Sequence, residues 1–295
     1  MKKFIITILS FALLLLIFYG VLLGRYCYKM KGYGFALPKE KTILVIGDSQ
    51  SQADIDDHIL SQVANVSLAH DGYFTMYRRL QLYVNANPQI DTVFVAFTPH
   101  TVRVDKDEFY HNFGYVQEST QHYFPFFTFE DWRLLIGHDA VDVVSALTTP
   151  LRFYWNVSPE YIREMGYFDV VDYSNLKDDI ESGAVRLTSD AFGGLDYGNK
   201  ITLEYLHRIV DFCKEQNIKL IGLNTPVYHA SDYFDMENFE NLKKTQFSDL
   251  EVWDYMDLEM PDDCRRDVNH LNRNGATLFS EIIKERLNKR VMSVN

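Results

Sequence analysis

The chain has 295 residues, of which 47% are hydrophobic and 24% charged, and its formal net charge at pH 7 is −12. This acidic balance argues against a nucleic-acid partner, because binding to phosphates needs clustered Lys and Arg. The three cysteines are widely spaced and odd in number. They indicate neither a disulfide framework nor a Cys-x-x-Cys metal site, and they leave open one bridge, between Cys213 and Cys264.

The chain starts with two lysines, Lys2 and Lys3, followed by an uncharged apolar stretch from Phe4 to Leu23. About 20 such residues are what a helix needs to cross a bilayer. A cleaved signal peptide is the competing interpretation, but bulky and charged residues follow where a signal peptidase needs small ones. We therefore expect a cytoplasmic stub at 1–3, a transmembrane anchor at 4–24 and a linker at 25–39. Basic residues flank the stretch on both sides, so charge alone does not decide its orientation.

A short apolar run, Lys41–Ile46, predicts a buried parallel strand, and Gly47, Asp48 and Ser49 follow it directly. A helix is expected to begin around Gln52. Ser49 then lies at the carboxyl edge of the sheet, where open α/β sheets bind their ligands. A serine at this edge is a candidate nucleophile, and the alternative is that it caps the helix.

Later apolar runs predict four more strands, at Val63–Leu68, Thr92–Phe97, Ile218–Leu223 and Val252–Leu258. Apolar residues at helical spacing in Lys200–Gln216 precede the third of these. Strand, helix and strand in succession are typical of a right-handed parallel crossover. The pattern thus predicts one α/β domain with a parallel sheet.

Residues 100–198 interrupt this alternation and form a large insertion, with many aromatic side chains between Phe109 and Phe168. A helix is expected at Trp132–Leu147. Two interpretations of the aromatic residues stay open: they pack a small core of their own, or they stack on the sugar rings of a glycan.

Asp267 and His270 are candidate partners for Ser49. A serine hydroxyl is a weak nucleophile unless a base takes its proton, and the base needs an orienting group. A spacing of three predicts that the two residues lie on one side of a helical turn. The carboxylate can then reach one ring nitrogen while the other faces Ser49.

Metal ligands are not indicated by the histidines, since none forms a His-x-x-x-His or His-Glu-x-x-His arrangement. Asp54, Asp56 and Asp57 resemble an acidic metal cluster. Carboxylates in the first turns of a helix also favour its dipole, and we expect this structural role. We expect no metal and no cofactor.

Gly47-Asp48-Ser49 after the first strand and Asp267-x-x-His270 near the end resemble, in this order, the first and last blocks of the SGNH/GDSL hydrolase superfamily. The tail His270-Leu271-Asn272 looks like the membrane-anchored branch, similar to the D-alanine transfer proteins of teichoic acid synthesis and the alginate O-acetylation proteins. The resemblance covers residues 40–290. It implies a three-layer α/β/α sandwich with a flavodoxin-like parallel sheet.

The resemblance also implies roles for four of these residues. Ser49 would be the nucleophile, His270 its base and Asp267 the group that orients His270. Asp48 would support the nucleophile. Attack on an ester would proceed through an acyl-enzyme.

An oxyanion hole would use the backbone N–H groups of Ser49 and Gly72. The third block of the family normally adds an asparagine amide, but here the strand runs into Thr98-Pro99-His100 without Gly-x-Asn. Thr98 or His100 would have to supply the third donor, because a hydroxyl or an imidazole N–H can also stabilise an oxyanion.

The resemblance implies a membrane-anchored acyl esterase or O-acyltransferase whose catalytic domain lies outside the cytoplasm. Expected partners are an acylated cell-envelope polysaccharide or another acyl ester, the membrane, and a membrane acyltransferase. Two alternatives remain: a non-catalytic, glycan-binding accessory of a membrane O-acyltransferase, and a lipid-directed esterase or thioesterase.

Overall fold

The computed structural model describes most of the chain. The described residues are 2–32, 34–69, 71–102, 123–148, 166–171, 176, 181, 200–228 and 236–294. They divide into two compact units: the anchor unit, Met1–Gly34 with Tyr110–Arg163, and the sheet unit, Phe35–Phe109 with Glu164–Asn295.

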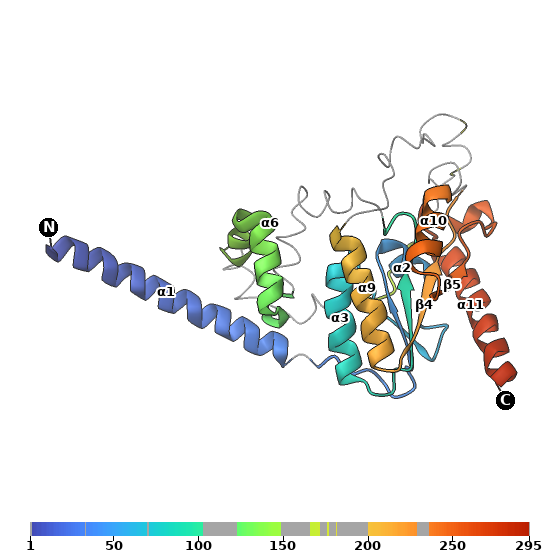
Figure 1. Ribbon diagram of the computed structural model, residues 1–295, viewed down its shortest axis with the longest axis horizontal. Helices are drawn as coiled ribbons and strands as arrows, with labels where there is room; N and C mark the ends of the chain where they lie inside the picture. The colour runs from blue at the N-terminus through green and yellow to red at the C-terminus, as the bar shows by residue number, and fades with distance from the viewer. Residues whose placement is uncertain are drawn as a thin grey trace. The chain divides into compact units, whose positions relative to one another are not determined.

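The sheet unit is built on five parallel strands (Figure 1). They are β1 (Ile43–Ile46), β2 (Val63–Asn65), β3 (Thr92–Ala96), β4 (Lys219–Asn224) and β5 (Glu251–Asp254). Their order across the sheet, β2-β1-β3-β4-β5, is that of flavodoxin-like doubly wound folds. The predicted parallel sheet is therefore confirmed.

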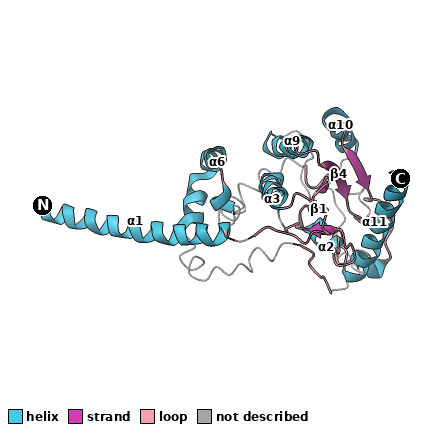
Figure 2. Cartoon of the chain, turned by 90° about the horizontal axis from the view of Figure 1, so that it is seen from below, coloured by secondary structure: helices cyan, strands magenta, loops and turns pink. Residues whose placement is uncertain are grey.

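Helices cover both faces of this sheet (Figure 2). Their bounds are α2 (Ser49–Asp54), α3 (Tyr73–Ala86), α9 (Lys200–Glu215), α10 (Met236–Gln246) and α11 (Arg273–Val294). Helices α3 and α9 pack together on one face, whereas α2 and α11 contact each other on the opposite side. The predicted three-layer α/β/α sandwich is confirmed.

Alternate strand residues point into the layer below α11, as the period of two in a strand requires. Val45, Phe94 and Ile221 of the sheet form one buried core cluster with Phe279 and Ile283 of α11. Complete burial of one such side chain contributes about 1.5–3 kcal/mol. This packing fixes α11 against the sheet and so fixes the chain segment that leads into it.

Two strands end earlier than predicted, β2 at Asn65 and β5 at Asp254. In each case the last residue turns its side chain back to the chain: Asn65 Oδ1 accepts the N–H of Ser67 at 3.0 Å, and Asp254 Oδ1 accepts that of Met256 at 3.1 Å. Asn and Asp side chains compete in this way with the hydrogen bonds of a sheet. The apolar pattern continues past both residues, so the lengths of these two strands were overestimated.

The anchor unit contains α1 (Lys2–Lys31), the 3-10 turn η1 (Phe124–Phe126) and α6 (Phe129–Thr148). Within the described residues, α1 is the one helix long and apolar enough to cross a membrane, a property that anchors and signal sequences share. It continues to Lys31, so residues 25–31 of the expected linker are helical. The helix expected at Trp132–Leu147 is confirmed within α6, but it is kinked at Asp139.

Aromatic residues of the insertion pack against one another and against α1. The ring centroid of Trp132 lies 5.4 Å from that of Phe127 and 6.4 Å from that of Phe124. The ring of Phe124 also stacks on Tyr26, with 5.1 Å between their centroids. These contacts favour the small-core interpretation for this part of the insertion. Most of its other aromatic residues, such as Tyr110, lie outside the described residues.

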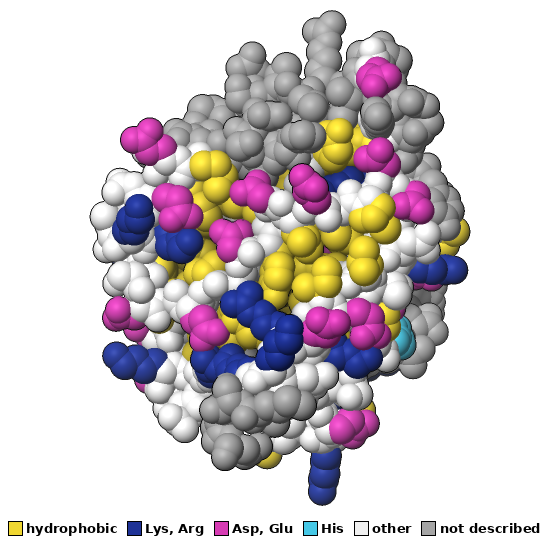
Figure 3. All heavy atoms as spheres, turned by 90° about the vertical axis from the view of Figure 1, so that its right-hand side faces the viewer, with side chains coloured by type: hydrophobic (Ala, Val, Ile, Leu, Met, Phe, Trp, Pro, Cys, Tyr) yellow, Lys and Arg dark blue, Asp and Glu magenta, His cyan; other side chains and the backbone are white. Residues whose placement is uncertain are grey.

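All three cysteines are free, and Cys213 and Cys264 are both buried, so the bridge left open by the sequence is not formed. On the face of the molecule shown in Figure 3, acidic and basic side chains lie beside one another around apolar patches.

Candidate active site

Ser49 is the first residue of α2, directly after β1 and the turn at Gly47. The helix therefore begins earlier than the expected start around Gln52. Its N-cap is Asp48, whose Oδ1 accepts the N–H of Gln50 at 3.1 Å. The interpretation of Ser49 as the helix cap is thus wrong, because Asp48 takes that place.

Gly47 allows the helix to follow the strand so closely. A Cβ at this position would collide with the side chain of Ser51 and lie 3.0 Å from the Cβ of Ala96. Any larger residue would push α2 away from the end of β1, and Ser49 with it.

The structure brings Ser49, His270 and Asp267 together. His270 Nε2 lies 2.9 Å from Ser49 Oγ, while His270 Nδ1 lies 2.9 and 3.0 Å from the two carboxylate oxygens of Asp267. An ionised carboxylate only accepts hydrogen bonds, so Nδ1 is the protonated nitrogen and Nε2 faces the serine as an acceptor. This is the arrangement in which a histidine can take the proton of a serine.

The expectation of a helical turn at Asp267 and His270 is wrong. The two residues lie in a bend between η5 (Asp262–Cys264) and α11. Oδ1 of Asp267 accepts the backbone N–H groups of Asn269 at 2.8 Å and His270 at 2.9 Å. Asp side chains stabilise turns in this way, and the turn gives the same proximity that a helix would give.

Electrostatics favour a charged pair at this position. Burial lowers the pKa of His270, but the hydrogen bond and charge of Asp267, helped by the charges of Asp54 and Asp48, outweigh it and leave the pKa raised. For Asp267, burial raises the pKa, but its hydrogen bond and charge interaction with His270 and the two backbone N–H groups lower it overall. The site therefore stabilises the imidazolium that forms when His270 takes a proton.

Helix α2 also holds the segment that carries His270. Asp54 Oδ1 accepts the N–H of Leu271 at 2.8 Å, and Gln50 Nε2 donates to the carbonyl of Asn269 at 3.3 Å. The residues on both sides of His270 are thus tied to the helix that presents Ser49. No pattern in the sequence indicates these two contacts, because α2 is too short to show a helical period.

Asp54 is fully buried, and burial raises its pKa to about 7 even though the charge of His270 and the N–H of Leu271 lower it. It is the last residue of α2, and Asp56 and Asp57 follow the helix. The expectation that these carboxylates lie in the first turns of a helix is therefore wrong.

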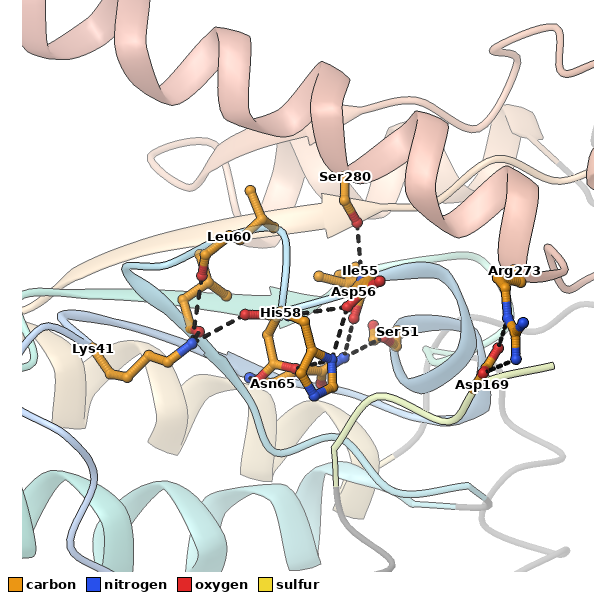
Figure 4. Close-up of polar contacts among 12 residues, drawn as sticks. Lys41, Ser51, Ile55, Asp56, His58, Leu60, Asn65, Asp169, Arg273 and Ser280 are labelled. Carbon is orange, nitrogen blue, oxygen red and sulfur yellow. Dashed lines mark hydrogen bonds and ion pairs between the residues drawn. The ribbon is translucent and has the colours of Figure 1, made fainter.

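Polar contacts fix the far end of α2 (Figure 4). The Asn65 amide donates to the carbonyls of Ser51 at 2.9 Å and Ile55 at 2.8 Å, and the N–H of Asp56 donates to Ser280 Oγ of α11 at 2.9 Å. These bonds thereby hold together the strand β2, the helix α11 and the helix that carries Ser49.

One group with the spacing of metal ligands occurs in the described part of the chain: ligand atoms of Asp56, Asp57 and His58 lie within 4.8 Å of one another. Its carboxylates already accept local hydrogen bonds, Asp56 from the N–H of His58 at 2.9 Å and Asp57 from the N–H of Asn65 at 3.0 Å. These bonds give the group a structural role in the loop after α2.

The two candidates for the third oxyanion donor differ in their surroundings. The Thr98 N–H donates to Thr101 Oγ1 at 2.9 Å, and Thr98 Oγ1 accepts the N–H of Thr101 at 3.1 Å, so both groups are used within one turn. His100 Nδ1 instead lies 3.3 Å from Asp48 Oδ2, next to Ser49.

Gly72, the other expected donor, is the N-cap of α3, and its N–H makes a long 3.4 Å contact with Thr75 Oγ1. The preceding Asp71 forms a buried ion pair with Arg79 and also accepts from Thr75. Gln52 of α2 accepts the N–H of Ala69 at 2.8 Å. The loop with Gly72 is thus fixed from both α3 and α2.

No family model matches the sequence, and no curated protein matches it. Two crystal structures are similar to it. A provisionally assigned acylhydrolase from Bacteroides fragilis NCTC 9343 has 12% identity and a TM-score of 0.41, with 91% of this chain and 96% of that chain covered. A GDSL-like lipase from Bacteroides thetaiotaomicron VPI-5482 has 10% identity and a TM-score of 0.40, with 90% and 97% covered. Likenesses this remote assign no activity, which has to be argued from the site.

Proposed function

We propose that this protein is a membrane-anchored serine acyl esterase or O-acyltransferase of the SGNH type. The observation that carries the proposal is the continuous contact from Ser49 Oγ through His270 to Asp267 at the carboxyl edge of a parallel sheet. Nucleophile, base and orienting carboxylate are the three parts that acyl transfer through a serine requires.

In the proposed reaction, Ser49 Oγ attacks the ester carbonyl carbon while His270 Nε2 takes the hydroxyl proton. The tetrahedral intermediate collapses as His270 returns this proton to the departing alcohol, leaving an acyl group on Ser49. A water molecule or a sugar hydroxyl then gives its proton to His270 and attacks the acyl carbonyl carbon. As the bond from this carbon to Ser49 Oγ breaks, His270 returns the proton to Oγ and restores the free serine. Asp267 keeps Nδ1 protonated throughout and stabilises the imidazolium.

The oxyanion would accept hydrogen bonds from the backbone N–H groups of Ser49 and Gly72. His100 is the better candidate for a third donor, since an imidazolium can donate from Nε2 while its Nδ1 bonds to Asp48, whereas Thr98 uses its groups within a turn. Loss of one such donor typically lowers kcat about 10²–10³-fold.

The apolar helix α1 supports a location at the membrane, and the resemblance of the site motifs to the SGNH family favours a sheet unit outside the cytoplasm. Tethering raises the local concentration of surface polymers around the enzyme. We therefore favour an acylated cell-envelope polysaccharide as the substrate and a membrane acyltransferase as the partner that supplies acyl groups.

The proposal is tested by intact-mass detection of fluorophosphonate labelling on the full-length protein in detergent. We expect one adduct on wild type, none on Ser49→Ala and strongly reduced labelling of His270→Ala. Ser51→Ala is the matched control, because Ser51 lies two residues further along the same helix and should not affect labelling. An unlabelled wild-type protein with intact secondary structure would refute the chemistry and favour a non-catalytic accessory.

If labelling succeeds, the fate of the acyl group separates the two activities. Wild type is supplied with p-nitrophenyl acetate in water and in water with added oligosaccharide. Acetylated sugar formed only with intact Ser49 identifies a transferase, and free acetate alone identifies an esterase.

A further inference from the structure

Helix α6 of the anchor unit exposes the side chains that a helix of a soluble protein would bury. Phe129 is 83% exposed, Ile136 50%, Val141 77% and Val144 57%. They occur on both sides of the kink at Asp139, so each half of the helix has an apolar exposed surface. Other apolar side chains, Leu135 and Val143, are buried within the unit.

Glu130 and Arg133 are exposed near the start of α6, but its other acidic residues do little to make the apolar surface polar. Asp131 is fully buried and accepts the N–H of Thr128 at 2.7 Å. Asp139 caps the second half of the helix by accepting the N–H groups of Val141 and Asp142, both at 2.9 Å. After Arg133, the exposed positions among the described side chains are all uncharged: Ile136, Gly137, Ala140, Val141 and Val144.

The place where this segment meets α1 is set by a stripe of side chains one turn apart. Leu22, Tyr26 and Met30 are buried, and Tyr26 stacks on Phe124, which in turn contacts Trp132 of α6. The contact begins at the end of the apolar stretch Phe4–Leu23. At 1.5 Å per residue these 20 residues span about 30 Å, the thickness of the hydrocarbon core.

Tyr26 therefore lies about one helical turn beyond the hydrocarbon when α1 spans a bilayer. This is the headgroup level, where aromatic side chains gather in membrane proteins. The last part of α1 also carries Arg25, Lys29 and Lys31, which suit anionic lipid headgroups.

We infer that α6 lies against the bilayer surface and buries its exposed apolar side chains among the lipids next to α1. The inference rests on the anchoring role proposed above for α1. The occupant is lipid because α6 belongs to the same unit as α1 and is linked to it, through the ring contacts of Trp132 with Phe124 and of Phe124 with Tyr26, at headgroup level. Apolar contact of this kind, with basic residues nearby, is how interfacial helices bind membranes.

The test uses the full-length protein in vesicles of phosphatidylcholine and phosphatidylglycerol. A bimane label is placed at Val141→Cys in a Cys27→Ser background, since Cys213 and Cys264 are buried. Leu16→Cys, in the middle of the apolar stretch, reports insertion of α1, and Glu285→Cys, exposed on α11, serves as the water-facing control. Doxyl-labelled lipid quenches a probe in lipid, and iodide quenches a probe in water.

We expect doxyl lipid to quench the label at residue 141 at least twofold more than the label at 285, with iodide showing the reverse. Phe129→Ser combined with Ile136→Ser should reduce the doxyl quenching at 141, whereas Glu130→Ser should not. A label at 141 that iodide reaches as easily as at 285 would overturn the inference. So would a label shielded from both quenchers, because protein would then cover α6.

The result is distinguishable from failure of the proposed function. No doxyl quenching at residue 16 would overturn the anchor and this inference together. Quenching at 16 without quenching at 141 would overturn this inference alone. Neither outcome affects fluorophosphonate labelling of Ser49, which tests the chemistry.

Discussion

The two units differ in which side chains they bury against expectation: the sheet unit buries charged ones, and the anchor unit exposes apolar ones. The sheet unit buries charged side chains; among its described residues, those at most 4% exposed are Asp48, Asp54, Asp71, Arg79 and Arg265. The anchor unit exposes apolar side chains along α1 and α6. Buried charged groups are costly, and here they hold the geometry of the candidate site. Exposed apolar side chains indicate that another apolar surface covers them.

The buried charges of the sheet unit are not equally well paired. Asp71 is matched by Arg79 and Thr75. Beside the His270 segment, the charges of Asp54 and Arg265 attract each other, but Oδ2 of Asp54 and the Nε and Nη1 atoms of Arg265 lack a hydrogen bond of good geometry in the described part of the chain. An unsatisfied buried polar group costs about 1–3 kcal/mol. The sheet unit thus concentrates its unfavourable burial next to the proposed base.

The largest effect is expected from Asp267→Asn. The change removes the charge that holds His270 in its proton-accepting form, and a similar change in a Ser-His-Asp protease lowers kcat about 10⁴-fold. Because only neutral His270 can act as base, activity of wild type should fall as pH drops through the raised pKa of His270. In the variant this midpoint should move to lower pH. The measurement is kcat/KM for p-nitrophenyl acetate between pH 5 and 9.

Asp262→Asn, an exposed carboxylate in the same segment, is the matched control and should follow wild type. An Asp267→Asn protein with wild-type rates and an unchanged midpoint would show that Asp267 does not orient the base.

Arg79→Ala should cost about 3–5 kcal/mol of unfolding free energy, because it leaves Asp71 buried without its counter-charge. It also removes the 2.6 Å hydrogen bond from Arg79 to the carbonyl of Val66. Urea unfolding followed by circular dichroism measures the loss. Lys284→Ala, which breaks an exposed pair with Glu281, should cost at most about 0.5 kcal/mol. Equal costs for the two variants would contradict the importance given to burial.

Much of this fold was readable from the sequence, since short apolar runs bounded by polar residues mark buried parallel strands. Ser49 and His270 were found through such runs and through their order along the chain. The strand ends were missed at Asn65 and Asp254, because the side chain of each accepts the backbone N–H two residues further along. A pattern of apolar residues does not reveal such hydrogen bonds. The kink of α6 has the same origin, a capping carboxylate at Asp139 inside an apolar period.

The supporting contacts of the site were not readable. Asp54 stands near Asp56 and Asp57 in the sequence, so it was grouped with them, although it is buried and they are not. Its partner Leu271 lies 217 residues away, and only the packing of α2 beside α11 brings them together. Long-range contacts of single polar side chains leave no periodic signal.

Asp54→Asn should change the pH dependence of stability. The folded-state pKa of Asp54, about 7, lies above its ordinary value of 3.8, so the folded protein holds more protons than the unfolded chain between these values. Stability from this group is therefore present at low pH and falls as pH rises towards 7, by at most about 1.4 kcal/mol per pH unit. Asparagine keeps an oxygen for the N–H of Leu271 and does not ionise. The stability of the variant relative to wild type should thus increase from pH 5 to 7.

Urea unfolding at several pH values measures this difference. Asp71, with a pKa raised by burial to about 6, contributes a slope of the same sign to both proteins, and it cancels in the comparison. Asp169→Asn is the control, because hydrogen bonding to Arg273 lowers the pKa of this exposed carboxyl and removes it from the range tested. A constant difference between Asp54→Asn and wild type would mean that Asp54 is ionised throughout.

The smallest effect is expected on the exposed side of α6, where Val141→Ala should change local stability by less than about 0.5 kcal/mol. Val143→Ala is the matched change on the buried side, 3% exposed against 77%, and should cost about 1.5 kcal/mol at about 0.8 per buried CH₂. Hydrogen exchange of peptides from residues 129–148, measured on the full-length protein in detergent, reports both. If the two valines cost the same, Val141 packs against protein, and the apolar surface of α6 is part of a core and not a membrane contact.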